Sequence, residues 1–323
     1  MTHRRSTPRR HIVVGLLGAL LLSMAAPTAR SEEASPPTRF RANQVAERAL
    51  IVSIDGLRPD VLLRADAPTI RGLMAAGSFT MWAVTTPVAV TLPSHTSMLT
   101  GVPPEKHGVT WNDDRPADRR VYPKVPTLFE VARRAGRTTA LAAGKSKFSA
   151  LLKPGTLDLA MVPTNGEMAD TAVADTVAHW IRTRRPQVIF VHLADVDLTG
   201  HEHGWGSSAQ LASIAVADRC VGRLLAALEA GGLRDSTILL VTSDHGGAGT
   251  SHGRDDPRSR HIPWILAGPG IRRNLELTGT KGLTVRTEDT FATLCELLGL
   301  DTPRKGIEGR SVRAALDSTP SRR

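Results

Sequence analysis

Cysteine is nearly absent from this 323-residue chain, which contains only Cys220 and Cys295. So low a content excludes the small scaffolds that disulfides hold together, and it leaves open whether the two residues pair or stay as buried thiols. Aromatic residues make up 4% of the chain, and no basic stripe interleaves with them, so the sequence does not predict nucleic-acid binding. The apolar run at 12–22 is too short for an ordinary membrane span, and we find no internal repeat or low-complexity domain.

The N-terminus has the pattern of an export signal. Basic residues precede the apolar run at 12–22, and small residues follow up to position 29. This pattern predicts a signal peptide over residues 1–29, and therefore a periplasmic or secreted protein with no transmembrane domain in its mature chain. Arg9-Arg10 directly before the run leaves the twin-arginine route open beside the general secretory route.

The remaining chain divides into a leader, one domain and a tail. Residues 30–47 are polar and predict a flexible leader, residues 48–314 a single domain, and residues 315–323 a disordered basic tail. The formal charge is +10, and removal of the four arginines within residues 1–29 would leave 10 − 4 = +6. A positive field of this size favours small anionic substrates.

Apolar runs alternate with amphipathic segments along the domain. The runs predict strands at 48–54, 137–143, 187–193, 236–242 and 262–266. Helical spacing predicts helices at 67–77, 126–135, 167–184, 207–230 and 287–298. Strands that alternate with helices indicate an α/β domain with a mainly parallel sheet, covered by helices on both faces.

Potential metal ligands follow three of these strands, where open α/β sheets place their chemistry. Asp55 follows the first strand, Asp197 and His201 follow the third, and Asp244-His245 follows the fourth, with His252 beyond a Gly-rich turn. Asp197 and His201 are four residues apart and share a face if their segment is helical. Each residue also has an ordinary interpretation, since Asp55-Gly56 is a common turn and Asp244 is able to cap a helix.

A hydroxyl and several polar residues complete the pattern. Thr91 precedes Leu92-Pro93 at the start of a predicted helix, where it is either a capping residue or a nucleophile beside a bound anion. Asn112 either donates to a phosphoryl oxygen or closes a turn. Lys145 and Lys147 follow a strand, where they either clamp an anion or are solvated.

The ligand types favour particular metals. The set comprises three carboxylates, three imidazoles and one hydroxyl, namely Asp55, Asp197, Asp244, His201, His245, His252 and Thr91. Two imidazole-containing groups indicate two metal ions, and a mixture of carboxylate and imidazole favours Zn²⁺, or Mn²⁺, over magnesium or calcium.

Four motifs together resemble the alkaline phosphatase superfamily, and most closely its type I phosphodiesterase/nucleotide pyrophosphatase branch. They are IVSIDGLRPD, TLPSHTSMLTGVPPEKHGV, DVDLTGHEHG and TSDHGGAGTSHG, and the resemblance extends from about Leu50 to about Val312. It implies an alkaline-phosphatase-like three-layer sandwich with a mainly parallel central sheet and little or no cap insertion.

The resemblance also implies roles for single residues. One metal is expected on Asp197, His201 and His252, and a second on Asp55, Asp244 and His245, with Thr91 as the nucleophile that bridges toward the second metal. Asn112 occupies the place of an asparagine that contacts the phosphoryl group. His261 is a rival of His252, which we prefer because SHGRDDPRSRHIPWILAGPG follows the family layout of HG, apolar strand and GPG.

Two departures bear on the substrate. Ser94 stands where this branch has asparagine, and GKSKF at 144–148 is similar to the paired-lysine element of relatives that hydrolyse monoesters or phosphonoacetate. The sequence therefore predicts a secreted metal-dependent phosphodiesterase/nucleotide pyrophosphatase that acts through a phosphothreonine intermediate. The alternatives are a phosphomonoesterase or phosphonoacetate-hydrolase-like enzyme and, in a different class, a non-catalytic metal-binding periplasmic module. Sulfatases use a modified Cys or Ser, and no Cys lies near Thr91.

Overall fold

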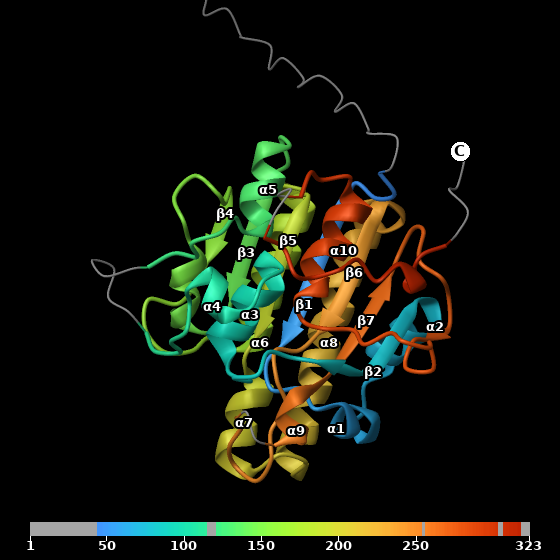
Figure 1. Ribbon diagram of the computed structural model, residues 1–323. Coiled ribbons are helices and arrows are strands. Elements are labelled where there is room, and N and C mark those ends of the chain that lie inside the picture. The colour runs from blue at the N-terminus through green and yellow to red at the C-terminus, as the bar shows by residue number, and fades with distance from the viewer. Residues whose placement is uncertain (1–43, 115–120, 254–255, 303–305, 318–323) are drawn as a thin grey trace, which may run out of the picture. The chain divides into compact units, whose positions relative to one another are not determined.

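A computed structural model describes residues 44–114, 121–253, 256–302 and 306–317 (Figure 1). The expected signal peptide, most of the expected leader and the last six residues of the expected tail lie outside this range. Among the described residues, no helix combines the length and the apolar character needed to cross a membrane.

The strands form one mixed sheet in the order β4-β3-β5-β1-β6-β7-β2-β8. Their bounds are β1 Arg48–Ile54, β2 Ser78–Val84, β3 Thr139–Ala143, β4 Leu159–Met161, β5 Val188–Leu193, β6 Thr237–Thr242, β7 His261–Ala267 and β8 Leu275–Glu276. Strand β7 runs antiparallel to both of its neighbours, β6 and β2, whereas the other pairings are parallel. The mainly parallel sheet is confirmed.

Helices cover both faces of this sheet. Their bounds are α1 Pro59–Arg64, α2 Pro68–Ala76, α3 Thr91–Thr100, α4 Pro104–His107, α5 Leu128–Arg134, α6 Asp170–Thr183, α7 Asp195–His203, α8 Ser208–Ala230, α9 Pro257–Arg260 and α10 Asp289–Leu298. Helices α1, α2, α6 and α8 share one apolar cluster with one face of the sheet, and α3, α5 and α10 share a second cluster with the other face (Figure 1). The expected three-layer α/β sandwich is therefore confirmed.

The central strands are almost wholly buried because helices cover both faces of the sheet. In β5 and β6 every residue is buried, as parallel strands between two helical layers require. Strand β1 lies between them, and its Ser53 pairs in register with His192 of β5 and Thr242 of β6. The carboxyl ends of these three strands are therefore level, and the segments that follow them emerge at the same edge.

Three strands were not predicted from the sequence. Strands β4 and β8 have three and two residues, too few for a recognisable pattern. Strand β2, SFTMWAV, alternates irregularly between buried and partly exposed positions, and its register with β7 shifts between Thr80 and Ala83. A bulge of this kind breaks the two-residue period on which strand prediction depends.

The two cysteines lie on opposite faces of the sheet. Cys220 on α8 belongs to the first apolar cluster and Cys295 on α10 to the second. Both are buried free thiols, and burial raises the pKa of each to about 12. Of the two interpretations that the sequence left open, the structure shows the unpaired one.

Candidate active site

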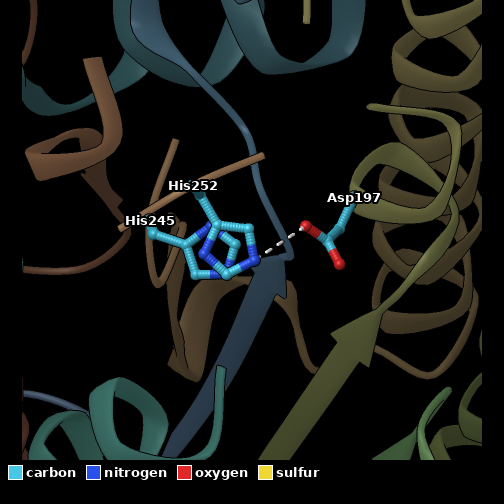
Figure 2. Close-up of side chains that lie close together, drawn as sticks. All are labelled: Asp197, His245 and His252. Carbon is cyan, nitrogen blue, oxygen red and sulfur yellow. Dashed lines mark ion pairs between the residues drawn. The ribbon is translucent and has the colours of Figure 1, made fainter. Parts of the chain in front are cut away.

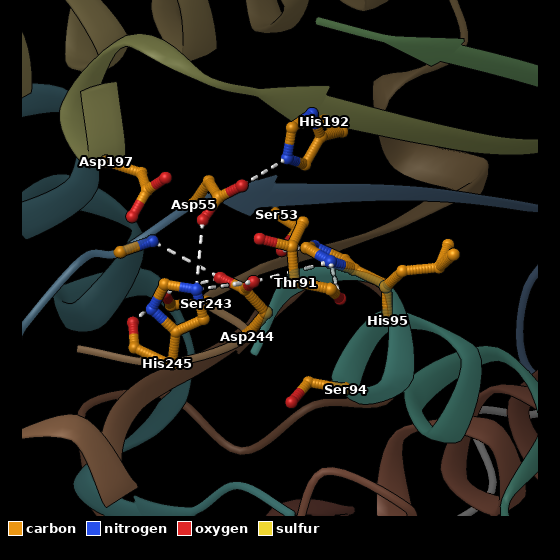
Figure 3. A network of polar contacts seen from close by, with 12 residues as sticks. Ser53, Asp55, Thr91, Ser94, His95, His192, Asp197, Ser243, Asp244 and His245 are labelled. Atoms are coloured by element: carbon orange, nitrogen blue, oxygen red, sulfur yellow. Dashed lines mark hydrogen bonds and ion pairs between the residues drawn. The ribbon is translucent and has the colours of Figure 1, made fainter. Parts of the chain in front are cut away.

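The polar residues that follow β1, β5 and β6 converge at the shared edge of the sheet (Figure 3). Asp55 is the first residue after β1, and Asp244 and His245 lie just after β6. Helix α7 begins two residues after β5 and carries Asp197 in its first turn. The level ends of three neighbouring strands thus bring together residues up to 245 − 55 = 190 positions apart.

Gly56 allows this close approach. Its φ is +69°, in the left-handed region, and a Cβ placed on it would lie 3.0 Å from the Cα and Cβ of Asp197. Its backbone N–H donates to Oδ1 of Asp244 over 3.2 Å. A side chain at this position would separate the β1 exit from α7.

One candidate metal group consists of Asp55, Asp244 and His245, which are all fully buried. Nε2 of His245 lies 3.3 Å from Oδ1 of Asp55 and 3.2 Å from Oδ2 of Asp244. One ligand atom from each residue lies within 4.8 Å of the others, as the donors around a single cation do.

The second candidate group consists of Asp197, His245 and His252 (Figure 2). The rings of His245 and His252 are stacked with their centroids 3.7 Å apart, and Nε2 of His252 lies 3.8 Å from Oδ1 of Asp197. His201 stands at the margin of this group: its Nε2 lies 3.5 Å from the same Oδ1, and its side chain is 43% exposed. The structure therefore brings the six expected carboxylate and imidazole ligands together, with His245 between the two groups.

The three histidines are held in the same way. Nδ1 of His201, His245 and His252 each lies 2.9 Å from a backbone carbonyl oxygen, that of Thr250, Gly246 and Ala89 respectively. A proton on Nδ1 donates to the carbonyl and leaves the Nε2 lone pair facing the carboxylates. This is the orientation that protein environments impose on metal-ligating histidines.

Four buried atoms in the site have no hydrogen-bond partner among the described residues, although they face one another. They are Oδ1 of Asp55, Oδ1 of Asp197, Oδ2 of Asp244 and Nε2 of His245. Leaving a buried acceptor unsatisfied costs about 1–3 kcal/mol, so four in one place need a common partner. Carboxylate oxygens and imidazole nitrogens are suitable donors for Zn²⁺, and these residues fit a divalent cation.

The charge balance leads to the same conclusion. Burial raises the pKa of Asp244 well above its usual value, and the negative charges of Asp55 and Asp197 raise it further. Burial also acts to raise the pKa of Asp55, but Lys145, His192 and His245 outweigh it and hold that pKa well below its usual value. Three carboxylates share one lysine, which leaves a deficit of positive charge.

Lys145 lies inside the ligand cluster instead of at its rim. It is 4% exposed, and its Nζ lies 2.7 Å from Oδ2 of Asp55 and 2.5 Å from Oδ2 of Asp197. Burial opposes its charge, but the two carboxylates outweigh burial and raise the pKa of Lys145 above its usual value. The ammonium uses the Oδ2 atoms and leaves both Oδ1 atoms free. Lys147 lies in the following 3-10 helix Ser146–Leu151 and is half-buried.

Thr91 is the first residue of α3 and lies beside the carboxylates in Figure 3. Nδ1 of His95 lies 2.8 Å from the carbonyl oxygen of Thr91 and 3.5 Å from Oδ2 of Asp244, so the start of α3 adjoins the first metal group. Thr91 is 1% exposed. A hydroxyl in this position is shielded from bulk water and adjoins an anionic cluster that needs a cation.

The start of α3 has no side-chain cap of its own, and Asn112 supplies one. Oδ1 of Asn112 accepts from the backbone N–H of Leu92 over 2.9 Å, while the N-cap residue is Val90. This fixes the amide plane of Asn112 next to Thr91. Ser94, within α3, takes no part in this cap. Its hydroxyl lies 2.9 Å from the hydroxyl of Thr86, which belongs to the loop that leads into the helix.

Two site residues were missed by the sequence analysis. Nε2 of His192 lies 2.8 Å from Oδ2 of Asp55, and Nε2 of His95 lies 2.8 Å from the hydroxyl oxygen of Ser53. Both histidines are fully buried, and burial lowers their pKa, so they remain neutral. A single histidine within the apolar run QVIFVHL was the available signal for His192.

Other polar residues near the site face elsewhere. His203 is about half exposed beside Glu202, and His261 stacks on Trp82 with ring centroids 4.3 Å apart. Asp195 turns back toward α6, where its Oδ2 accepts from the backbone N–H of Asp170 over 3.2 Å. His261 thus lies outside both metal groups.

Asp170 gives a prediction about pH. Its Oδ1 accepts from the backbone N–H groups of Ala194 and Asp195, over 2.6 and 3.1 Å, and so holds the start of α7. Burial, aided by the charge of Asp195, raises the pKa of Asp170 to about 8. The folded state therefore binds the extra proton between about pH 4 and pH 8, and the group costs stability as pH rises through that window, at most about 1.4 kcal/mol per pH unit.

The variant Asp170→Asn keeps the acceptor and cannot ionise. Its free energy of unfolding, from urea titrations between pH 5 and pH 9, is expected to fall less with pH than that of the wild type. Exposed Asp175→Asn is the control and should keep the wild-type slope. An unchanged slope in Asp170→Asn would show that Asp170 does not titrate in this window.

Comparison with known proteins gives the following matches. The family model described as type I phosphodiesterase / nucleotide pyrophosphatase matches residues 49–262. A 2,3-bisphosphoglycerate-independent phosphoglycerate mutase of Syntrophotalea carbinolica is 30% identical over 215 residues, which cover 59% of this chain and 39% of the mutase. The bis(5'-adenosyl)-triphosphatase enpp4 of Mus musculus is 27% identical over 228 residues, 65% of this chain and 49% of that enzyme. The chain thus spans half or less of the length of these curated relatives.

Solved structures share the fold at low identity. Murine ectonucleotide pyrophosphatase/phosphodiesterase 5, an inactive form in complex with AMP, aligns with a TM-score of 0.68 and 17% identity, over 84% of this chain and 100% of the other. The phosphonate monoester hydrolase of Agrobacterium radiobacter aligns with a TM-score of 0.62 and 16% identity, over 84% and 77% of the two chains. At this identity the match concerns the fold alone.

Proposed function

The chain belongs to the type I phosphodiesterase / nucleotide pyrophosphatase family, and we propose that it is a metal-dependent hydrolase of phosphoric ester bonds that uses Thr91 as its nucleophile. One observation carries the proposal: three carboxylates and three uniformly oriented histidines converge beside the start of α3, where Thr91 lies. A purely structural role does not explain four buried atoms that lack partners at the centre of this cluster.

The residues divide into two metal sets. Asp55, Asp244 and His245 would hold one cation. We assign Asp197, His201 and His252 to the other, since Nε2 of both histidines faces Oδ1 of Asp197. The His245 ring, stacked against His252, would adjoin both cations. Two divalent cations, most simply Zn²⁺ and alternatively Mn²⁺, would supply Lewis acidity and charge neutralisation for the phosphoryl group.

Thr91 performs the chemistry in two stages. Its Oγ1 forms a bond to phosphorus as the bond from phosphorus to the leaving ester oxygen breaks, which gives a phosphothreonine. Water then attacks phosphorus, and the Thr91 oxygen departs. Burial of Thr91 keeps bulk water away during the first stage, and the neutral His95 at its carbonyl oxygen holds the helix start in place.

The equatorial phosphoryl oxygens need donors in fixed positions. Asn112 is anchored through its Oδ1, so its Nδ2 group is left to donate to the substrate. Preorganised donors of this kind contribute more to catalysis than flexible ones, because they need no reorganisation as charge develops. We assign Asn112 to substrate binding on this basis.

The two lysines favour a second candidate, a phosphomonoesterase or a phosphonoacetate-hydrolase-like enzyme. A monoester carries one more negative charge than a diester and needs a counter-charge. The structure separates the two lysines, because Lys145 is committed to Asp55 and Asp197 while Lys147 is half-buried beyond it. Lys145 therefore serves as the counter-charge of the ligand carboxylates. We propose both lysines as substrate-binding residues, with Lys147 facing the additional charge of a monoester.

Rates on bis-p-nitrophenyl phosphate and p-nitrophenyl phosphate separate the two candidates. A phosphodiesterase is expected to prefer the first. Lys147→Ala should lower the monoester rate by about ten-fold, the effect of one charge-assisted hydrogen bond, and leave the diester rate unchanged. Lys145→Ala should lower both rates, because it removes the counter-charge of Asp55 and Asp197.

Lys153→Ala is the matched control, since Lys153 pairs with Glu130 away from the ligand cluster, and it should change neither rate. If Lys147→Ala lowers both rates equally, the assignment of Lys147 to monoesters is wrong. If the zinc-loaded protein hydrolyses neither compound nor any member of a wider phosphoester panel, a non-catalytic metal-binding module becomes the better interpretation.

Export to the periplasm or the exterior remains part of the proposal. It depends on residues 1–29, which lie outside the described part of the chain. N-terminal sequencing of the protein recovered from the host would test it, and a mature chain that begins near residue 30 is the expected result.

A further inference from the structure

We infer that Trp205 is a positioning residue of the metal centre. It fixes three ligand-bearing segments relative to one another, and its loss weakens metal binding. This inference rests on the proposed function, because it assumes that the two groups of ligands bind metal. It concerns a residue outside every ligand set named above. Trp205 lies just after α7, beyond Gly204, and is 8% exposed.

The indole and the backbone of Trp205 each make one hydrogen bond to a ligand-bearing segment. Nε1 of the indole donates to the carbonyl oxygen of Gly56 over 2.8 Å, directly after the ligand Asp55. The backbone N–H of Trp205 donates to the carbonyl oxygen of Gly249 over 2.7 Å, in the loop that carries His245 and His252. The residue thus connects the end of α7 with both the β1 exit and this loop.

The indole also packs against two glycines that flank ligands. A Cβ placed on Gly200 would lie 2.9 Å from Cε2 of the indole, and one placed on Gly247 would lie 2.3 Å from the same atom. Gly200 directly precedes His201 on α7, and Gly247 lies two residues after His245. A side chain at either position would collide with the ring, so both backbones pack directly against the indole.

Two ligand histidines contact the indole directly. The ring of His201 is edge-on to Trp205 with centroids 5.2 Å apart, and the ring of His252 is edge-on at 5.9 Å. Aromatic contacts of this geometry restrict how a ring rotates. Together with the Nδ1 bonds to carbonyl oxygens, they leave these imidazoles little freedom to turn Nε2 away from Asp197.

One side chain therefore adjoins the β1 exit, α7 and the loop at 244–252, which together supply all six expected protein ligands. Residues that orient metal ligands without touching the metal commonly change metal affinity by about 10- to 100-fold when replaced. The variant Trp205→Phe removes the N–H donor and part of the ring and retains an apolar aromatic side chain.

The test compares Trp205→Phe with Trp264→Phe. Trp264 is the matched control because it is also a buried tryptophan, 1% exposed, with a hydrogen-bonded indole. Its Nε1 donates to Oγ1 of Thr290 over 3.1 Å, within the apolar cluster on the α10 side of the sheet. Each variant loses one buried indole hydrogen bond, so the metal-free proteins should unfold at similar urea concentrations. Zn²⁺ affinity, measured by competition with a chromogenic chelator, should fall by about ten-fold or more in Trp205→Phe and stay at the wild-type value in Trp264→Phe.

Fluorescence provides a second readout. Because Trp205 lies against His201 and His252, Zn²⁺ should change the tryptophan emission of the wild type and of Trp264→Phe, and this change should be lost in Trp205→Phe. If Trp205→Phe does not fold, Gly247→Ala disturbs the same contact from the opposite side and should lower Zn²⁺ affinity while the indole remains.

The possible failures are distinguishable. Wild-type protein that binds no Zn²⁺ would overturn the proposed metal centre itself. Wild type that binds Zn²⁺, together with a Trp205→Phe variant of unchanged Zn²⁺ affinity, would overturn the role of Trp205 alone. Equal losses of affinity in Trp205→Phe and Trp264→Phe would show a general effect of stability and would also refute it.

Discussion

Replacing Thr91 with alanine is expected to abolish turnover while the protein still binds metal. Oγ1 of Thr91 is the atom that attacks phosphorus in the proposed mechanism, and removing a nucleophile commonly lowers kcat by at least about 10³-fold. The six carboxylate and imidazole ligands are untouched, and each of the two groups keeps its three ligand atoms without the Thr91 hydroxyl. The measurements are kcat on bis-p-nitrophenyl phosphate and zinc content after dialysis.

Two further variants separate nucleophilic attack from packing. Thr96→Ala also removes a buried hydroxyl from α3, one that donates to the carbonyl oxygen of Leu92 over 2.7 Å, and it should retain activity. Thr91→Ser keeps the hydroxyl and should retain part of the rate. Full activity in Thr91→Ala would refute the nucleophile assignment, and equal losses in Thr91→Ala and Thr96→Ala would assign the effect to helix stability.

Removing the metal is expected to abolish activity and to lower stability as well. Within the described part of the chain, the cluster contains three buried carboxylates that share the ammonium of Lys145, and four of its atoms have no hydrogen-bond partner. A cation that binds only the folded state adds about 4 kcal/mol to the free energy of unfolding when its concentration exceeds Kd a thousand-fold. Chelation should therefore shift the urea midpoint downward, and added Zn²⁺ should restore it.

The variants distinguish a specific metal effect from a general effect of the chelator. In Thr91→Ala the stability shift should persist, because that protein retains its ligands. In Asp244→Asn the shift should shrink, because one carboxylate of the Asp55, Asp244 and His245 group is gone. A chelator that leaves the unfolding curve of the wild type unchanged would contradict the proposed metal centre.

Much of the fold followed from the residue pattern. The runs that form β1, β5 and β6 are mostly apolar, because strands between two helical layers have no solvent-facing side. The helical spacing of apolar residues likewise predicted α8, at Ser208–Ala230. The pattern failed at β2, whose bulge interrupts the alternation, and it did not reveal that β7 reverses direction, because direction depends on pairing partners distant in the sequence.

The candidate site was likewise predictable from the sequence only in part. Residue type and place in the chain were enough to single out Asp55, Asp197, Asp244 and the histidines, because polar residues directly after buried strands emerge at one edge of a parallel sheet. Residue type did not reveal that Lys145 lies among the carboxylates, that His192 supports Asp55 from within β5, or that Trp205 contacts three segments.

The sequence by itself therefore determined the class of fold, the family and the chemical nature of the candidate ligands, because these depend on local pattern and on the order of motifs along the chain. Only the tertiary structure decided which ligand atoms face one another, which lysine is buried, and that Cys220 and Cys295 remain apart on opposite faces of the sheet. The physical reason is that distances between side chains from different strands follow from register, helix packing and burial. These are properties of residue pairs far apart in the chain, and no local stretch of sequence contains them.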